Sequence, residues 1–225
     1  MKIVSVPSTL LCMGYIELTY CGNWTKEPAV KTPFEMTYRD HDSELVEDFF
    51  FVAERFDGLD EREQSAIRRH TGVIEARMAF ENGRTLVPAR AALELTRYLM
   101  SFGAVGLFVD PSSKIFSPKS VREMSSDEAQ VLFHLLVEVY GDEERFYTSG
   151  MGAFGLPDVE FLYGLHTHET GQAAVFGMAM KMVCGDFVPV PGSVFKNTES
   201  APIFQIERDE TPSDENEMGC WRLFE

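Results

Sequence analysis

Side chains that could do chemistry are concentrated just after a glycine-rich segment of this sequence. Two carboxylates, Asp158 and Glu160, stand two residues apart, and the imidazoles of His166 and His168 repeat that spacing. Residues two apart share one face of a β-strand, so an unbroken strand over 158–168 would line one face with all four side chains. Imidazole and carboxylate groups are suitable ligands for zinc, iron or manganese, and a nearby glutamate can serve as a third ligand or general base.

The local sequence also supports a structural role for this segment. Gly164 lies between the two pairs and is expected to interrupt the strand. Residues 166–171 are typical of a turn that leads into a helix, with Thr167 or Thr170 as the N-cap and Glu169 placed to favour the helix dipole. In this interpretation the two imidazoles belong to a turn and do not converge on the carboxylates.

These patterns leave two interpretations of the site. In the preferred one, Asp158 and Glu160 bind a ligand, no cofactor is expected and no catalytic residue is assigned. In the alternative, His166 and His168 bind a divalent metal beside the two carboxylates, in a small metal-dependent hydrolase or oxygenase. The first is preferred because an H-x-H pair without a third ligand at a recognised spacing is a weak motif.

The glycine-rich segment has the spacing of a dinucleotide-binding motif, with Gly150, Gly152 and Gly155 as its glycines. That motif requires a helix after the glycines, whereas Pro157 and a second strand-like segment follow here. The segment therefore predicts a hairpin or bulge between two strands, with positive φ at one or more of the glycines.

Apolar periodicity predicts main helices at about 86–102 and 126–140, and a third, Met-rich helix is expected at about 171–184. The wholly apolar segment Ala104–Val109 predicts a central strand that is covered on both faces. A short helix is expected after Asp60 as its N-cap. Further strands are predicted at 46–56, 73–80, 145–149, 159–163, 187–190, 203–207 and 221–224. The sequence thus predicts one α+β domain over 1–225, with a β-rich region at 1–56 and a mixed, largely antiparallel sheet that carries the three main helices.

Charge argues against several partners. The formal net charge is −16, from 36 acidic and 20 basic residues, and such a surface repels nucleic-acid phosphates and anionic membranes. No apolar stretch approaches the ~20 residues needed to span a bilayer. A basic protein is the favoured partner, and the acidic run Glu207–Glu217 is either its contact surface or a solvated loop.

Cysteine usage points to a reducing compartment. The chain has four cysteines and no C-x-x-C pair, so free thiols are expected. The apolar segment Ile3–Met13 is interrupted by Pro7 and preceded by the single basic residue Lys2, which is a poor match to a signal peptide. We therefore expect a cytoplasmic protein.

Three features stand out between about residues 84 and 161. They are the apolar segment 102–109 after a helix, the Ser/Pro segment 114–118, and the turn from Gly150 to Glu160. Together they resemble a bacterial family known as domain of unknown function 4261. The resemblance implies an intracellular α+β protein with no established activity, so it assigns no catalytic residue. Together with the acidic composition, it favours a cytoplasmic binding or interaction protein of an immunity-like or regulatory kind over the metal-dependent enzyme. The sequence does not fix the oligomeric state.

Overall fold

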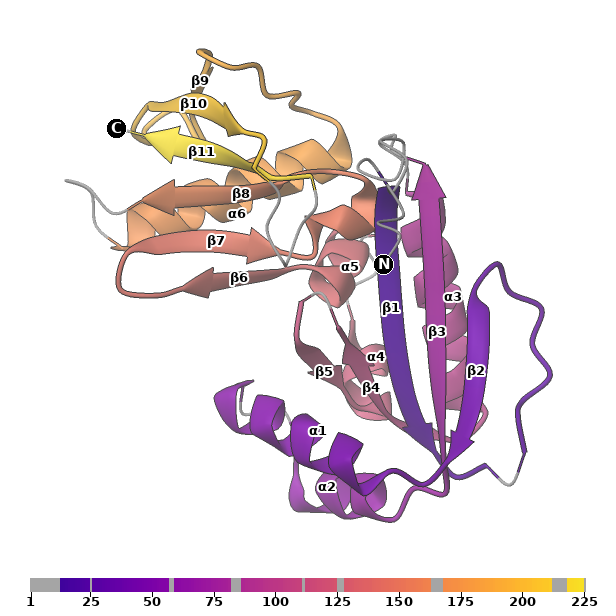
Figure 1. The fold of residues 1–225 in the computed structure, drawn as a ribbon. Helices are drawn as coiled ribbons and strands as arrows, with labels where there is room; N and C mark the ends of the chain where they lie inside the picture. The colour runs from indigo at the N-terminus through magenta and orange to yellow at the C-terminus, as the bar shows by residue number, and fades with distance from the viewer. Residues whose placement is uncertain are drawn as a thin grey trace, which may run out of the picture. The chain divides into compact units, whose positions relative to one another are not determined.

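The computed structural model describes residues 13–24, 26–56, 59–81, 86–110, 112–124, 128–162, 168–211 and 218–224. The chain divides into two compact units, each built around its own sheet (Figure 1). One unit comprises Ile16–Met78 and Val87–Leu136, and the other comprises Val137–Glu225 with the segments 1–15 and 79–86. The predicted α+β class is confirmed, but the strands form two sheets where one was expected.

The first sheet has five strands in the order β2-β3-β1-β4-β5. Its strands are β1 (Met13–Gly22), β2 (Glu35–Asp40), β3 (Gly72–Glu81), β4 (Ala104–Val109) and β5 (Lys114–Phe116). The helices of this part of the chain are α1 (Ser43–Phe56), α2 (Glu61–Arg68), α3 (Val87–Ser101), α4 (Pro118–Glu123) and α5 (Glu128–Leu136). Strand β4 pairs antiparallel with β1 on one side and with β5 on the other, so the predicted interior strand lies inside the sheet.

Both faces of this sheet are covered near β4. On one face Tyr20 is fully buried and its hydroxyl lies 2.9 Å from Thr96 Oγ1 of α3. On the other face, Cys21 belongs to an apolar cluster under α1 and α2, against which Phe108 packs. Leu107 is fully buried, and Phe108 on the opposite face packs against the apolar cluster. The expectation that both faces of β4 are covered is therefore confirmed.

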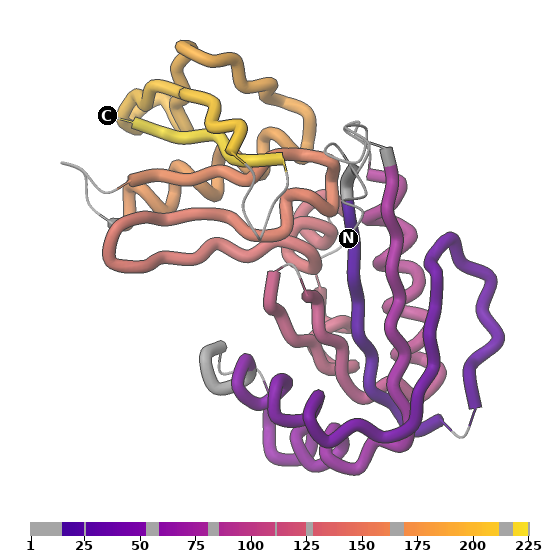
Figure 2. Tube along the Cα trace, viewed as in Figure 1, coloured from indigo at the N-terminus to yellow at the C-terminus, as the bar shows by residue number. Residues whose placement is uncertain are grey.

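The second sheet has six strands in the order β6-β7-β8-β11-β10-β9. Its elements are β6 (Glu138–Gly141), β7 (Arg145–Ser149), the 3₁₀ turn η2 (Met151–Phe154), β8 (Asp158–Leu162), α6 (His168–Cys184), β9 (Val194–Phe195), β10 (Phe204–Asp209) and β11 (Cys220–Phe224). Figure 2 follows the chain from β8 through α6 and β10 before it returns as β11, which pairs parallel with β8. The last strand of the chain therefore completes the centre of this sheet.

Helix α6 packs against β8 and β7 and lies behind them in the view of Figure 1. Gly171 permits this approach, because a Cβ at that position would collide with the ring of Phe161 and crowd that of Phe146. Residues of the opposite parity, such as Tyr147 and Glu160, lie on the other face of the sheet because side chains alternate along a strand. This alternation places the predicted carboxylates away from α6.

Three predicted elements were wrong in type or extent. The segment 46–56 belongs to helix α1, because its buried residues Val46, Phe49 and Val52 recur with a helical period; its aromatic content had suggested a strand. The helix expected at 126–140 ends at Leu136 and is followed by strand β6. The strand expected at 187–190 is not formed, and β9 lies further along the chain.

The predicted N-cap of α2 is confirmed. Asp60 caps α2, accepting a hydrogen bond from the backbone N–H of Glu63, whose side chain accepts one from Asp60 N–H in return. Cys21, Cys184 and Cys220 form no disulfide. Among the helices of the described ranges, none has the length and apolar character needed to cross a membrane.

The turn between β7 and β8 has positive φ at Gly150 (105°) and Gly155 (66°), as predicted. The two glycines flank the 3₁₀ turn η2, whose own Gly152 has room for a Cβ, 3.8 Å from Met218 Cε.

We expect Gly150→Ala to lower the free energy of unfolding by about 1–2 kcal/mol, because an L-residue is strained in this region. Gly152→Ala is the matched control and should change it by less than about 0.5 kcal/mol. Urea unfolding measures both, and equal losses would contradict this account of the turn.

Candidate functional site

Asp158 anchors the start of β8. It is buried, with 6% of its surface exposed, and its Oδ1 accepts hydrogen bonds from Thr148 Oγ1 at 2.8 Å and from Met151 N at 3.2 Å. Thr148 Oγ1 in turn accepts a hydrogen bond from Val159 N at 2.9 Å. The carboxylate therefore fastens the glycine-rich turn to two strands, which is the role that a buried polar group with several hydrogen bonds usually has.

Glu160 occupies the centre of the second sheet. Its side chain is 4% exposed, and it lies opposite Tyr147 on β7 and Arg222 on β11. Arg145 Nη1 donates to Glu160 Oε2 at 3.0 Å, and Arg222 Nε donates to Oε1. Each carboxylate oxygen therefore accepts a charge-assisted hydrogen bond from an arginine, which offsets the cost of burying the charge.

The two arginines continue this row of charges toward its ends. Arg222 Nη2 lies 2.8 Å from Asp209 Oδ2, and Arg145 Nε lies 3.5 Å from Asp142 Oδ2. The side chains of Arg145 and Arg222 are 41% and 38% exposed, whereas the carboxylate between them is buried. A buried anion thus holds two partly exposed cations in fixed positions.

Tyrosines adjoin the same row. The guanidinium of Arg145 lies 4.4 Å from the centre of the Tyr147 ring, in cation–π geometry. The ring of Tyr140 lies 5.6 Å from that of Tyr147, and both residues are partly exposed. We call this surface the Arg–Tyr face, defined by Tyr140, Arg145, Tyr147, Glu160 and Arg222. It lies on the side of the second sheet opposite α6.

The Cys220 thiol on the same strand as Arg222 is not a suitable nucleophile. Burial, reinforced by the negative charge of Glu160, raises the pKa of Cys220 to about 12. Since the thiolate is the reactive form, this cysteine is inert at neutral pH.

The two predicted histidines are not placed with the carboxylates. His166 lies outside the described residues, and His168 begins α6 with a side chain that is also outside them. Their convergence with Asp158 and Glu160 therefore stays a prediction. Within the described ranges, no group of three or more histidine, cysteine, aspartate or glutamate side chains is arranged to hold a metal ion.

The acidic run is only partly described. Glu207 lies in β10 and is exposed, whereas residues 212–217 lie outside the described ranges. The arginine of the run, Arg208, turns to the backbone: its Nη1 donates to the carbonyls of Asp209 at 2.6 Å and Cys220 at 2.8 Å, and its Nη2 donates to that of Met218. It joins the two ends of the β10–β11 connection, a role that the sequence did not reveal.

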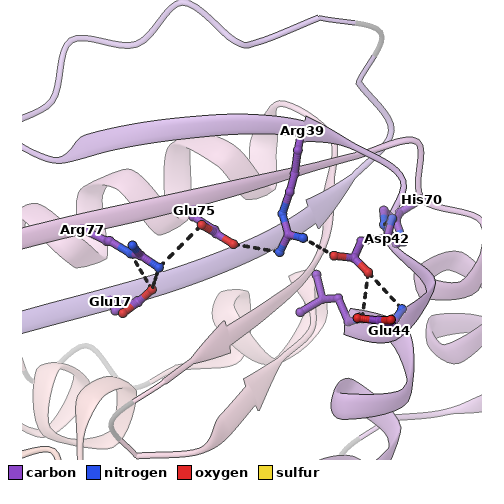
Figure 3. A network of polar contacts seen from close by, with 8 residues as sticks. Glu17, Arg39, Asp42, Glu44, His70, Glu75 and Arg77 are labelled. Atoms are coloured by element: carbon purple, nitrogen blue, oxygen red, sulfur yellow. Dashed lines mark hydrogen bonds and ion pairs between the residues drawn. The ribbon is translucent and has the colours of Figure 1, made fainter.

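A second polar network crosses the first sheet (Figure 3). Arg77 Nε donates to Glu17 Oε1 at 2.6 Å, and Arg77 Nη2 lies 3.7 Å from Glu75 Oε2. Arg39 donates to Glu75 Oε1 at 2.7 Å and also to Asp42 Oδ2. The arginines are about half exposed, so these ion pairs contribute little to stability individually. The network instead helps to fix the position of Asp42, the residue before helix α1, because its last ion pair joins Arg39 to this aspartate.

Comparisons with protein-family models, with curated proteins and with solved structures find no match to this chain. The resemblance to domain of unknown function 4261 therefore stays a prediction.

Thr148 offers a test of the anchoring role of Asp158. Thr148→Val removes the donor to Asp158 and the acceptor for Val159 N–H, so we expect a loss of about 1–3 kcal/mol in the free energy of unfolding. Thr148→Ser keeps the hydroxyl and should cost less than about 1 kcal/mol. Thermal or urea unfolding measures both, and a valine variant as stable as the serine variant would show that these hydrogen bonds do not hold the turn.

Proposed function

We propose that this chain is a cytoplasmic binding protein whose Arg–Tyr face contacts a basic protein partner. The observation that carries the proposal is the buried Glu160 carboxylate, which orients the partly exposed side chains of Arg145 and Arg222 beside Tyr147. Arginine and tyrosine are enriched at protein–protein interfaces, where they supply much of the binding energy. Side chains that are already oriented lose less entropy on binding, which favours recognition by such a face.

Charge supports a basic partner. By strand register, the side of the second sheet that bears the Arg–Tyr face carries two guanidiniums and five carboxylates. The guanidiniums are those of Arg145 and Arg222, and the carboxylates are those of Glu138, Asp158, Glu160, Glu207 and Asp209. This excess of acids agrees with the net charge of −16 for the whole chain. Asp158 and Glu160 are buried, whereas Glu207 is exposed and Glu138 and Asp209 are partly exposed. A polypeptide with exposed lysines or arginines would be attracted to these three accessible carboxylates, and the attraction would weaken with salt.

The positions of the two predicted carboxylates favour binding over catalysis. Asp158 accepts hydrogen bonds from the turn, and both oxygens of Glu160 accept from arginines. A general base needs an oxygen that can reach a substrate proton. The cytoplasmic location is supported by the three described cysteines, which form no disulfide.

Charge reversal at the exposed rim of the face tests the proposal. Gln205 and Glu207 are exposed on β10, beside Phe224 and Arg222 of β11. In a Gln205→Lys, Glu207→Lys variant, we expect at least a tenfold loss of affinity for a basic partner recovered by the wild-type protein, because two new cations face it. Affinity is measured by calorimetry at about 0.05 M and about 0.5 M salt, and the wild-type value should fall with salt.

Glu94→Lys on α3 is the matched control, since this exposed residue lies on the other unit. It should leave the affinity nearly unchanged. A partner that binds equally well at both salt concentrations, or that loses affinity equally with either variant, would rule out the Arg–Tyr face as the binding surface. A chain that recovers no basic partner at low salt would count against the proposal as a whole.

A further inference from the structure

His70 is a buried histidine whose protonation state is fixed by its two partners. It lies between α2 and β3 with 2% of its surface exposed. Its Nδ1 lies 2.7 Å from the carbonyl of Ile67, and its Nε2 lies 3.1 Å from the backbone N–H of Asp42. A carbonyl only accepts and an amide N–H only donates, so Nδ1 must carry the proton and Nε2 must be bare. The imidazole is therefore neutral in this arrangement.

The partner of Nε2 is the residue that starts helix α1. Asp42 Oδ1 accepts hydrogen bonds from the backbone N–H groups of Glu44 at 2.9 Å and Leu45 at 3.1 Å, which caps the helix (Figure 3). The preceding residue, His41, donates from Nδ1 to the carbonyl of His70 at 2.9 Å, and the two imidazole rings lie 4.3 Å apart. The start of α1 is thus fastened to His70 through the ring and through the backbone.

Helix α1 covers part of the apolar core. Phe49 of α1 is fully buried with Cys21 of β1 and Ile67 of α2 in one cluster. The fit is close, since a Cβ on Gly106 would collide with both Phe49 and Cys21. Movement of α1 away from the sheet would therefore expose the Cys21 thiol.

We propose that His70 is a pH-sensitive latch, which holds the start of α1 while its imidazole is neutral and releases it on protonation. A proton on Nε2 would point at the N–H of Asp42, so the two donors would repel each other and that hydrogen bond would be lost. The latch does not depend on the binding function proposed for the Arg–Tyr face.

The charged and titratable groups around His70 support this direction. Burial lowers the pKa of His70, and the positive charges that His41 and Arg39 can carry lower it further. The hydrogen bond to Ile67 and the negative charge of Asp42 act in the opposite direction and raise it. The pKa of Asp42 is itself lowered, first by its bond from Leu45 N–H, so its carboxylate stays charged in the range where histidine titrates. Asp42 itself is therefore not the group that titrates between about pH 5.5 and about pH 7.5.

The sign and the size of the response follow from linkage. The ring binds a proton more weakly when α1 is closed than when it is open, so the closed state is fully favoured above the pKa of a free imidazole, 6.5. As pH falls below that value, the open state gains a factor of up to roughly ten per pH unit, until the closed state also binds the proton. Opening at about pH 5.5 should therefore exceed opening at about pH 7.5 by up to roughly tenfold.

The experiment measures how well the fold protects Cys21 from an alkylating reagent. The full chain is labelled at about pH 7.5 and about pH 5.5, and mass spectrometry follows the peptide that contains Cys21. Each rate is divided by the rate in denaturant at the same pH, which removes the effect of pH on the thiolate. In the wild type, we expect protection to fall several-fold to tenfold at the lower pH, with little dependence on dilute urea because the opening is local.

Two variants separate the latch from general acid destabilisation. His70→Gln supplies an amide oxygen and an amide nitrogen without a titrating group, and we expect its protection to be nearly the same at both pH values. His134→Gln removes an exposed imidazole on α5, outside the contacts of the latch, and should keep the wild-type response. Equal protection of the wild type at both pH values, or a pH response that His70→Gln keeps, would overturn the proposal.

Ring ¹⁵N spectroscopy of the wild type provides a test that needs no variant. At about pH 7.5 we expect His70 to carry its proton on Nδ1, and its titration midpoint to lie below that of a free imidazole. A proton on Nε2, or a charged ring at that pH, would contradict the latch even if every variant failed to fold.

Discussion

A carboxylate buried in the middle of a β-sheet must be neutralised, and this requirement organises the second sheet around Glu160. An isolated charge in that position would cost several kcal/mol. The neighbouring strands supply the positive charges that pair with it, Arg145 from β7 and Arg222 from β11. Because β11 is the last strand of the chain and pairs parallel with β8, the sheet is completed only when the C-terminal segment returns to Glu160. The ion pairs therefore favour one register of β11, and a shift by one residue would turn Arg222 to the face that α6 covers.

This interior requirement has a consequence on the surface. A surface arginine usually samples many conformations, and its pairing with an exposed acid contributes little. Arg145 is restrained both by the buried carboxylate and by the ring of Tyr147, and Arg222 is restrained by Glu160 and Asp209. Arginine suits this position better than lysine, because its planar group can donate to a carboxylate while it stacks on an aromatic ring. The same contacts that satisfy the sheet interior thus produce a preorganised polar and aromatic surface.

Sequence patterns predicted the features that depend on near neighbours. The spacing of Asp158 and Glu160 correctly placed both on one strand, and the glycines correctly predicted positive φ. Apolar periodicity located α3, and the Met-rich composition of the segment located α6. The partners could not be predicted, because Arg222 lies 62 residues from Glu160 along the chain. The latch was missed for a similar reason, since 28 residues separate Asp42 from His70 and no local pattern marks the contact.

The error at α1 has a related physical cause. Its run of three phenylalanines has high strand propensity, but propensity is a weak preference that tertiary burial can override. What decides the outcome is that Val46, Phe49 and Val52 recur every three residues and are buried on one side of a helix.

The two buried polar groups differ in how their environment responds to pH. The partners of Glu160 are guanidiniums, which keep their protons throughout the physiological range, so the donors on the Arg–Tyr face do not change with pH. The partners of His70 are one backbone acceptor and one backbone donor, an arrangement that only the neutral ring can satisfy. A charged group held by permanent charges gives a rigid surface, whereas a neutral group held by two opposed hydrogen bonds gives a contact that one proton can break. The second sheet is thus suited to constant recognition, and the start of α1 to a change of state.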